Sequence, residues 1–468
     1  MSKKYTPTFT YTIEIDTEKY QKDRLEKRLN AARILYNQVL GYGIEGLKKL
    51  RKDERYKKYL QEKNYKKLDE LKEGYGLTKT KFEEFLKPKR YKYQQLIGSN
   101  VGQKIAFKAF QAVSADMYKL RGKPRFKGYG RVRSIEGKAN TGGIRFKGGR
   151  FFINKEEFSL KYEKSEKLKA YEEYALSKPL KYCRIVRKEI RGEYRYYLQL
   201  ILEGVPYFKP ERKCGNEIVG LDLGPQTLAI TTKKYARLQI FASELERENK
   251  LEGRIQRKIN RKKRLLNPEN FEGKKLKKGK HKWKRSKKLK KLESQYRDLK
   301  RKNKEKRKEL HGRLIKELLE LGVNFKIEKI NYKAWQKLFG KSIGAKAPGL
   351  FIELLRRKAE SAGGGVYEFS TFQTKLSQTC VCGRVKKKSL SERLHICECG
   401  VKIQRDLLSS YLGLFVENDQ LDIGSACKHY PRFEQPSRAA IHNLLDSRLP
   451  LATFGLLKSE LENQLLEL

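Results

Sequence analysis

The chain has 468 residues, with 109 Lys or Arg against 55 Asp or Glu and a formal net charge of +54. Hydrophobic residues make up 38% of the chain, enough to fill the cores of roughly two to four domains. Solubility alone needs a net charge of only about 2–8 on a small domain. The excess of positive charge therefore indicates a polyanionic partner whose released counter-ions drive binding.

The same composition argues against membrane and secreted classes. The sequence contains no run of about 18 apolar residues that could span a bilayer. The positive charge is spread along the chain, which does not suit a membrane-surface protein. Because the first residues lack the apolar stretch of a secretory signal, we expect a cytoplasmic protein whose thiols stay reduced.

The N-terminal part of the chain predicts a small β-domain interrupted by helices. Residues 6–16 alternate with period two, as a strand does, and helical spacing follows to about residue 120. Glycines and prolines break this pattern at residues 121–130. Beyond them the chain is β-rich, with turns expected at Gly148-Gly149 and Arg191-Gly192.

The middle of the chain predicts further strands and then basic helices. A short apolar run at residues 218–224 encloses Asp222 between glycines and is typical of a strand, with further strands expected at 227–232 and 238–241. Residues 254–308 are the most basic part and predict long helices along nucleic-acid phosphates, although the 267–288 part also fits a solvated charge run. A separate helix is expected at residues 310–321, with Gly322 as its C-cap.

The remaining elements carry the residues of chemical interest. Residues 323–330 predict a strand that contains Glu328. A helix at 351–361 and a strand at 365–369 follow. Beyond a group of cysteines, a helix is expected at 406–416, and the tail from residue 417 has only weak periodicity.

Four cysteines form two tight pairs, each followed by glycine: Cys380 and Cys382, then Cys397 and Cys399. Zinc takes four soft ligands at tetrahedral geometry, which two facing cysteine turns supply. Both pairs are C-x-C, tighter than the usual C-x-x-C, so reduced structural cysteines or a lost metal site remain the alternative. Three isolated cysteines are expected to have structural roles: Cys183, Cys214 and Cys427. The basic residues between the two pairs are expected to contact phosphate: Lys386, Lys387, Lys388 and Arg393.

Three acids are candidate catalytic residues. Asp222 and Glu328 lie in predicted strands, and Asp406 opens a helix. A single carboxylate on a strand is usually just exposed at an edge. Three that approach one another would repel, and Mg²⁺ relieves the repulsion because it prefers oxygen ligands. Two such ions about 3.5–4 Å apart can activate water for phosphodiester hydrolysis, which is the chemistry of an RNase H-like nuclease.

The order of several motifs resembles TnpB, the RNA-guided nuclease family of bacterial insertion sequences, and the related type V CRISPR effector nucleases. The resemblance spans about residues 5–416. The matching stretches are residues 31–37 (AARILYN), 122–126 (GKPRF), 220–224 (GLDLG), 327–331 (IEKIN), 347–351 (APGLF), 376–380 (LSQTC) and 397–400 (CECG), running into Arg405-Asp406.

The resemblance implies an α+β multidomain fold. A wedge β-barrel would hold a helical recognition insert, and an RNase H-like (RuvC) α/β nuclease domain would be split by a zinc-ribbon insert that binds target nucleic acid. The implied domains are 1–20 plus 121–208 (wedge), 21–120 (recognition), 209–370 plus 400–468 (RuvC, with a basic helical segment at 244–321) and 371–399 (zinc-binding).

The resemblance also implies an RNA-guided DNA endonuclease that uses one RuvC site and a short flanking motif. Asp222, Glu328 and Asp406 would bind two catalytic Mg²⁺ ions, and the four paired cysteines would bind structural Zn²⁺. The partners would be a guide RNA and target double-stranded DNA, with no membrane and a monomer favoured. Residues 91–95 and 104–119 are candidate readers of the flanking motif.

Three positions depart from the family pattern. Both cysteine pairs are short, Gln404 stands where many relatives have an acid, and Leu408 stands where asparagine is common. Two alternatives share the resemblance: a compact type V CRISPR effector or CRISPR-transposon intermediate with the same chemistry, and a non-cleaving RNA-guided repressor. The sequence also leaves open a DNA-joining transposase on an RNase H-like fold and a guide-free RNA-binding protein.

Overall fold

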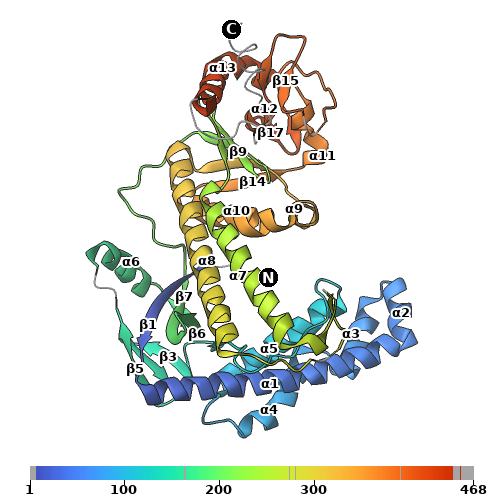
Figure 1. Cartoon of the computed structure of the whole chain (residues 1–468), viewed down its shortest axis with the longest axis vertical. Helices are drawn as coiled ribbons and strands as arrows, with labels where there is room; N and C mark the ends of the chain where they lie inside the picture. Colours follow the sequence, from blue (N-terminus) through green and yellow to red (C-terminus); the bar gives the residue numbers. More distant parts are fainter. Residues whose placement is uncertain are drawn as a thin grey trace. The chain divides into compact units, whose positions relative to one another are not determined.

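The computed structural model describes residues 7–162, 165–273, 275–279, 281–389, 392–445 and 454. The chain forms two compact units, Met1–Tyr207 and Phe208–Leu468, each with both helices and strands (Figure 1). The predicted mixed α and β class is confirmed at this level. Parts of the predicted wedge and RuvC domains lie outside the described residues, namely 1–6, 446–453 and 455–468. No helix in the described ranges has the length and apolarity that a bilayer span requires.

An antiparallel seven-stranded sheet organises the first unit. β1 has the predicted alternation, with Phe9, Tyr11, Ile13 and Ile15 buried. β3 also contacts β6, so the sheet comes near to closing on itself. The strand order is β2 (Ser134–Glu136), β6 (Leu180–Ile190), β7 (Glu193–Glu203), β1 (Thr8–Asp16), β5 (Glu156–Lys161), β4 (Arg150–Ile153) and β3 (Ile144–Lys147).

The longest strands of this sheet, β6 and β7, form the hairpin that the sequence predicts at Arg191-Gly192. These two residues have φ angles of 53° and 89°. Positive φ at both central residues is what a type I′ turn requires, and its twist matches that of the strands. The local turn chemistry thus sets the register of the hairpin.

Five helices separate β1 from β2, and a sixth follows β5. α1 packs against α4 and α5 through a core of aliphatic and aromatic side chains. A Cβ at Gly43 would lie 2.4 Å from Phe82 and 2.9 Å from Val113, so glycine permits this close packing. The helices are α1 (Lys19–Lys52), α2 (Glu54–Gln61), α3 (Tyr65–Gly74), α4 (Lys79–Tyr91), α5 (Ser99–Met117) and α6 (Glu166–Leu176).

A mixed five-stranded sheet forms the centre of the second unit. β10, β9 and β8 are antiparallel neighbours, whereas β8, β13 and β14 run parallel. The order across the sheet is β10 (Ala236–Ile240), β9 (Thr227–Thr231), β8 (Ile218–Leu223), β13 (Asn324–Glu328) and β14 (Gly365–Phe369).

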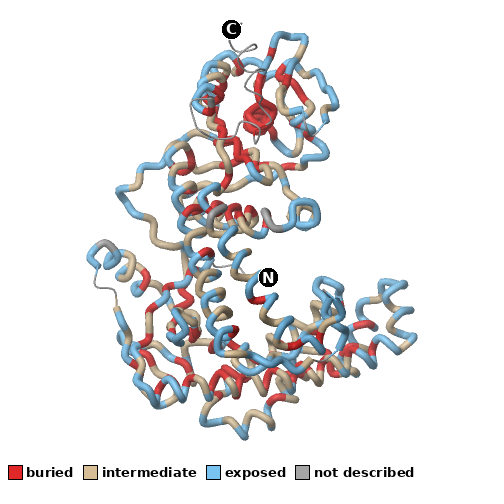
Figure 2. The backbone as a smooth tube through the Cα atoms, viewed as in Figure 1, coloured by how far each residue is buried: buried red, intermediate tan, exposed pale blue. Residues whose placement is uncertain are grey.

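Helices cover both faces of this sheet. On one face, apolar residues of β8 and β13 pack against α8 (Lys287–Leu321) and α10 (Pro348–Ser361). On the other face lies α12 (Arg405–Gly413), which shares a core with α13 (Ile423–Leu445). Every residue of α12 is buried, and Figure 2 shows the helix as a continuous buried segment.

The predicted basic helices are present as α7 (Glu246–Leu266) and α8. They pair in antiparallel fashion, with Lys263 Nζ 3.0 Å from Glu293 Oε1. The separate helix expected at residues 310–321 is wrong, because α8 continues unbroken from Lys287. No glycine or proline interrupts that helix before residue 312, and ion pairs one turn apart, such as Arg301–Glu305 at 2.7 Å, support its basic half.

Gly322 is the C-cap of α8, as predicted, and its N–H donates to the Leu318 carbonyl. Its φ of −177° is extended backbone that any residue adopts. A Cβ at this position would lie 1.8 Å from the Glu217 carbonyl oxygen. Glycine is therefore needed there for close approach of two chain segments, and not for its conformation.

The segment between the two basic helices is held by side chains. Asn267 Nδ2 donates to the Lys284 carbonyl at 3.1 Å, and Asn270 Nδ2 donates to the Lys282 carbonyl at 2.7 Å. Short strands β11 (Phe271–Glu272) and β12 (Lys275–Leu276) pair between these contacts. The described part of 267–288 thus has defined structure, unlike a solvated charge run.

Candidate active site

Close packing of α12 on β8 brings Asp222 and Asp406 to the same place. A Cβ at Gly220 would lie 2.1 Å from the Ser410 carbonyl oxygen, so only glycine lets the helix backbone rest on the strand. Asp222 lies two residues along the strand from this contact, on the same face. Asp406 lies about one turn back along the helix. Two residues along β8 and one turn along α12 both span roughly 6–7 Å from the contact between Gly220 and Ser410. The carboxyl groups of Asp222 and Asp406 therefore lie close together.

Strand register adds Glu328 to this pair. β13 runs parallel to β8, with Ile327 opposite Leu221. The next position along each strand holds Glu328 and Asp222, on the face away from the apolar core of β8 and β13. The three predicted acids therefore converge from two strands and one helix.

The pKa values of the acids reflect this proximity. Burial, followed by the charges of Asp406 and Glu328, raises the pKa of Asp222 well above its usual value. Burial and the Asp406 charge raise the pKa of Glu328 to about 7. Like charges at one site disfavour ionisation. A bound cation would reverse that effect, and grouped carboxylate oxygens are the donors that Mg²⁺ prefers.

Asp406 is also surrounded by hydrogen-bond donors and cations. Thr227 Oγ1 donates to Asp406 Oδ2 at 3.4 Å. Arg393 Nη1 lies 3.2 Å from Asp406 Oδ1, and Arg405 Nε lies 3.7 Å from the same oxygen. The contact between Arg393 and Asp406 was not predicted. The only sequence signal was the position of Arg393 between the two cysteine pairs.

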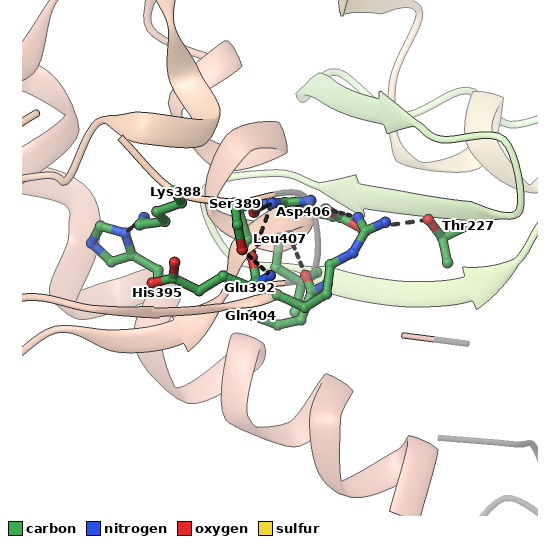
Figure 3. Close-up of polar contacts among 10 residues, drawn as sticks. Thr227, Lys388, Ser389, Glu392, His395, Gln404, Asp406 and Leu407 are labelled. Atoms are coloured by element: carbon green, nitrogen blue, oxygen red, sulfur yellow. Dashed lines mark hydrogen bonds and ion pairs between the residues drawn. The ribbon is translucent and has the colours of Figure 1, made fainter. Parts of the chain in front are cut away.

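Arg405 holds the segment that carries Arg393. Its Nη1 atom donates to the carbonyls of Ser389 and Glu392 at 3.0 Å and 2.9 Å, and its backbone N–H donates to the Arg393 carbonyl at 2.7 Å. Ser389 and Glu392 are labelled beside Asp406 in Figure 3. Arg405 therefore fixes the segment that leads to the Arg393 side chain.

Gln404 begins the helix on which Asp406 lies. Its Oε1 atom accepts a hydrogen bond from the Leu407 N–H at 2.9 Å, which caps the first turn of α12 (Figure 3). The Gln404 side chain is fully buried. This neutral cap orders the start of the helix without adding another charge.

Lys326 holds the opposite end of α12. It pairs with Gly220 in the strand register and so lies on the face of the sheet that α12 covers. Its Nζ atom donates to the carbonyls of Leu414 and Val416 at 3.0 Å and 2.8 Å. These carbonyls follow the last turn of α12, where a cation is favourable. The helix is thus anchored to the sheet at both ends.

The four paired cysteines come together as predicted. Their sulfur atoms all lie within 4.8 Å of one another. Cys380 Sγ is 3.6 Å from Cys399 Sγ, and Cys382 Sγ is 3.6 Å from Cys397 Sγ. Zinc–sulfur bonds of about 2.3 Å at tetrahedral angles place sulfurs about 3.8 Å apart. The donor set therefore fits one zinc ion.

The two C-x-C-G turns have the same conformation. Gly383 and Gly400 have φ angles of 87° and 89°. The N–H of each donates to the carbonyl of the first cysteine in its pair, at 2.9 Å for Cys380 and 3.0 Å for Cys397. The Cys399 N–H is the main reason that the pKa of Cys397 falls to about 7, whereas burial raises the pKa values of Cys380 and Cys399. The short spacing is therefore compatible with four convergent sulfurs.

The second turn leads directly to the acidic site. β15 (Leu394–Ile396) and β16 (Lys402–Gln404) flank it, and α12 starts at the next residue. Among the isolated cysteines, buried Cys183 fits the expected structural role, whereas Cys214 and Cys427 are exposed.

Comparison with known proteins identifies the region around this site. Residues 349–412 match the family model described as Cas12f1-like, TNB domain. The chain is similar to a chain of the cryo-EM structure of the Cas12f1-sgRNA-target DNA complex, with a TM-score of 0.46 and 12% identity over 89% of this chain and 100% of that chain. It also matches the cryo-EM structure of the CRISPR-Cas12f ternary complex, with a TM-score of 0.27 and 15% identity over 86% of this chain and 82% of that chain. A comparison with curated proteins found no match.

The matched region contains the cysteine cluster, Arg393 and Asp406. The second unit is thus a mixed α/β fold that carries an acidic cluster beside four convergent cysteines. Through its Cas12f1-like TNB domain, the chain is related to the TnpB and type V CRISPR effector proteins. The relationship expected from the sequence motifs is confirmed.

Proposed function

We propose that this chain is an RNA-guided DNA endonuclease that hydrolyses phosphodiester bonds at one RuvC-type site. The observation that carries the proposal is the convergence of Asp222, Glu328 and Asp406 from two strands and a helix, with the raised pKa values that grouped carboxylates produce. The net charge of +54 suits a polynucleotide partner. The TNB relationship supports the same class.

The three carboxylates would hold Mg²⁺. When bound, two such ions would supply an activated water and stabilise the leaving oxygen. Thr227 and Arg405 orient the Asp406 carboxylate. Arg393 places a guanidinium beside it, and this group has the planar donor geometry that suits a phosphate of the bound strand.

The cysteine cluster would have a structural role. A zinc ion held by Cys380, Cys382, Cys397 and Cys399 would join the two turns into one unit. Because β16 runs into α12, that unit would fix the start of the helix that bears Asp406. Removal of zinc should therefore affect cleavage through the position of Asp406.

We extend the proposal to the domains. Sequence recognition would belong to guide pairing, with the protein holding the heteroduplex backbone and reading a short flanking motif. Residues 91–95 and 104–119 are the proposed motif readers. The proposed domains are wedge (1–20 and 121–208), recognition (21–120), RuvC (209–370 and 400–468) and a zinc-binding target-nucleic-acid domain (371–399) whose range lies within the 349–412 match.

The test uses protein purified together with the RNA that accompanies it, and DNA whose sequence matches that RNA. Mg²⁺-dependent cleavage of this DNA is measured. Asp222→Ala should abolish cleavage and leave RNA and DNA binding intact. Asp69→Ala, at a side chain 74% exposed on α3, is the matched control and should cut normally. Retained cleavage by the Asp222 variant would refute the site, and an RNA fraction without a guide would refute guided recognition.

A further inference from the structure

The segment that links the helices of the first unit to its later strands has an unusual surface. Residues 118–131, here called the strap, follow α5 and precede β2. Among them Tyr118, Leu120, Phe126 and Tyr129 are 54%, 75%, 60% and 79% exposed. Basic residues lie between these side chains in sequence: Lys119, Arg121, Lys123, Arg125, Lys127 and Arg131. Exposed apolar side chains that gather on one segment mark interaction sites.

The strap is fixed to α1 at residues 126 and 127. Asn37 makes two hydrogen bonds of 2.9 Å to the backbone of Lys127, one to its carbonyl and one from its N–H. The Lys127 ammonium lies 4.0 Å from the centre of the Tyr36 ring. The Phe126 ring lies 3.8 Å from the position of a Cβ at Gly41. The backbone around Phe126 is thus held in one conformation.

Residues 129 and 130 follow the same helix toward its N-terminus. Arg187 Nη2 donates to the Gly130 carbonyl at 2.6 Å, and Arg187 also pairs with Glu26. Tyr129 lies with Asn30 and Arg33 of α1 around one small cavity. The α1 residues in these contacts are three or four positions apart, at 41, 37, 33, 30 and 26, and so lie on one face of the helix. The strap runs along that face.

A cluster of cations lies beside the strap. Glu136 pairs with Arg184, Lys108 and Lys104, at 2.7 Å, 3.2 Å and 4.0 Å. Lys127 lines a second small cavity together with Lys104, Lys108 and Glu136. Burial together with the Lys108 charge lowers the pKa of Lys127. Three cations therefore share one carboxylate, and the Lys127 ammonium adds a fourth positive charge nearby. An anion such as a phosphate would balance the excess.

We propose that the strap is a binding site for an unpaired nucleic-acid strand, with bases stacked on Phe126 and Tyr129 and phosphates held by the neighbouring lysines. Aromatic faces exposed on a fixed backbone next to cations are the arrangement that binds single strands without regard to sequence. The site deepens the proposed function by naming a surface for unpaired nucleotides. It does not depend on the cleavage chemistry.

The test is fluorescence anisotropy with the full chain and labelled single strands of about 12 nucleotides, within the span of one such site. RNA and DNA of one sequence are compared to show which strand the strap prefers. Phe126→Ala/Tyr129→Ala should weaken binding by at least about fivefold per ring, because each stacked base contributes at least that much. The salt dependence of strand binding should be the same in this double variant as in the wild type, because no phosphate contact is removed.

Matched variants separate stacking from folding and from general charge. Tyr65→Ala removes another ring, 66% exposed on α3, and should bind as the wild type does. Phe126→Leu/Tyr129→Leu keeps apolar bulk without rings and should show the same loss as the alanine pair, whereas Phe126→Tyr/Tyr129→Phe should restore binding. Lys127→Gln should lower the salt slope by about one.

Three results would overturn the strap site: unchanged affinity in both the alanine and leucine pairs, an equal loss from Tyr65→Ala, or an equal loss for a blunt duplex of the same length. Each of these leaves the Asp222→Ala experiment unaffected. A wrong strap site is therefore distinguishable from a wrong nuclease assignment.

Discussion

Gly220→Ala is the sharpest test of how the acidic site is built. The added methyl group would lie 2.1 Å from the Ser410 carbonyl oxygen, a backbone atom that no side-chain rotation can move. Cβ atoms rarely approach any atom closer than 3.0 Å, so α12 and β8 must separate by at least about 0.9 Å. The movement carries Asp406 away from Asp222 and Glu328.

The size of the effect follows from this displacement. Forcing a methyl group into a packed contact costs roughly 1–3 kcal/mol of unfolding free energy. A misplacement of about 1 Å at a reacting centre lowers a rate by on the order of 100-fold. We therefore expect a moderate loss of thermal stability together with a much larger loss of Mg²⁺-dependent cleavage.

The assay compares thermal unfolding with single-turnover cleavage at saturating Mg²⁺ for wild type and variant. Gly312→Ala is the matched control, because nothing lies within 4 Å of a Cβ at that position of α8. It should be neutral or stabilise the protein by about 0.5–1 kcal/mol, as alanine does within a helix. Wild-type cleavage by Gly220→Ala would refute the argument that close packing of α12 aligns the acids.

Three further predictions concern the neighbouring groups. In Mg²⁺-free buffer Glu328→Gln should raise the melting temperature at pH 8 but change it little near pH 4.5. The folded-state pKa of about 7 exceeds the usual value of 4.5, so ionisation of Glu328 destabilises the folded state as pH rises from 4.5 to 7. An equal change in melting temperature at both pH values would contradict this. Lys326→Met should lower stability by about 1.5–3 kcal/mol through loss of two charged hydrogen bonds, measured by denaturant unfolding; a change below about 0.5 kcal/mol would show that those bonds do not anchor α12. Metal analysis should find about one zinc ion per chain in the wild type and in Cys214→Ser, and none in Cys399→Ser. A wild-type protein that is equally stable with and without metal would reject the zinc site.

Local patterns in the sequence predicted much of the secondary structure. The alternation in β1 and the Arg191-Gly192 turn needed only neighbouring residues, because side-chain period and turn chemistry are local. The paired cysteines were recognisable for the same reason, since zinc turns place their ligands close together in sequence. The residues of the acidic site were identified by type and motif.

Other features depended on contacts between distant residues. The roles of Gly220 and Gly322 come from backbone segments that approach them from elsewhere in the chain, and no local pattern distinguishes such a glycine from one in a turn. The pairing of Arg393 with Asp406 depends on how Arg405 holds the carbonyls of Ser389 and Glu392, just before Arg393 in the chain. The unbroken length of α8 depends on ion pairs along a charged surface that carries little apolar periodicity.

By itself, then, the sequence determined the basic charge, the kinds of elements and the cysteine turns, because composition and short-range patterns encode them. The three acids were marked by residue type and by the motifs that resemble a known family. Only the tertiary structure decided that the acids meet, that Arg393 joins them and that the strap lies along α1 with its rings exposed. The physical reason is that burial, pKa shifts and close backbone contacts arise from packing between segments far apart in the chain.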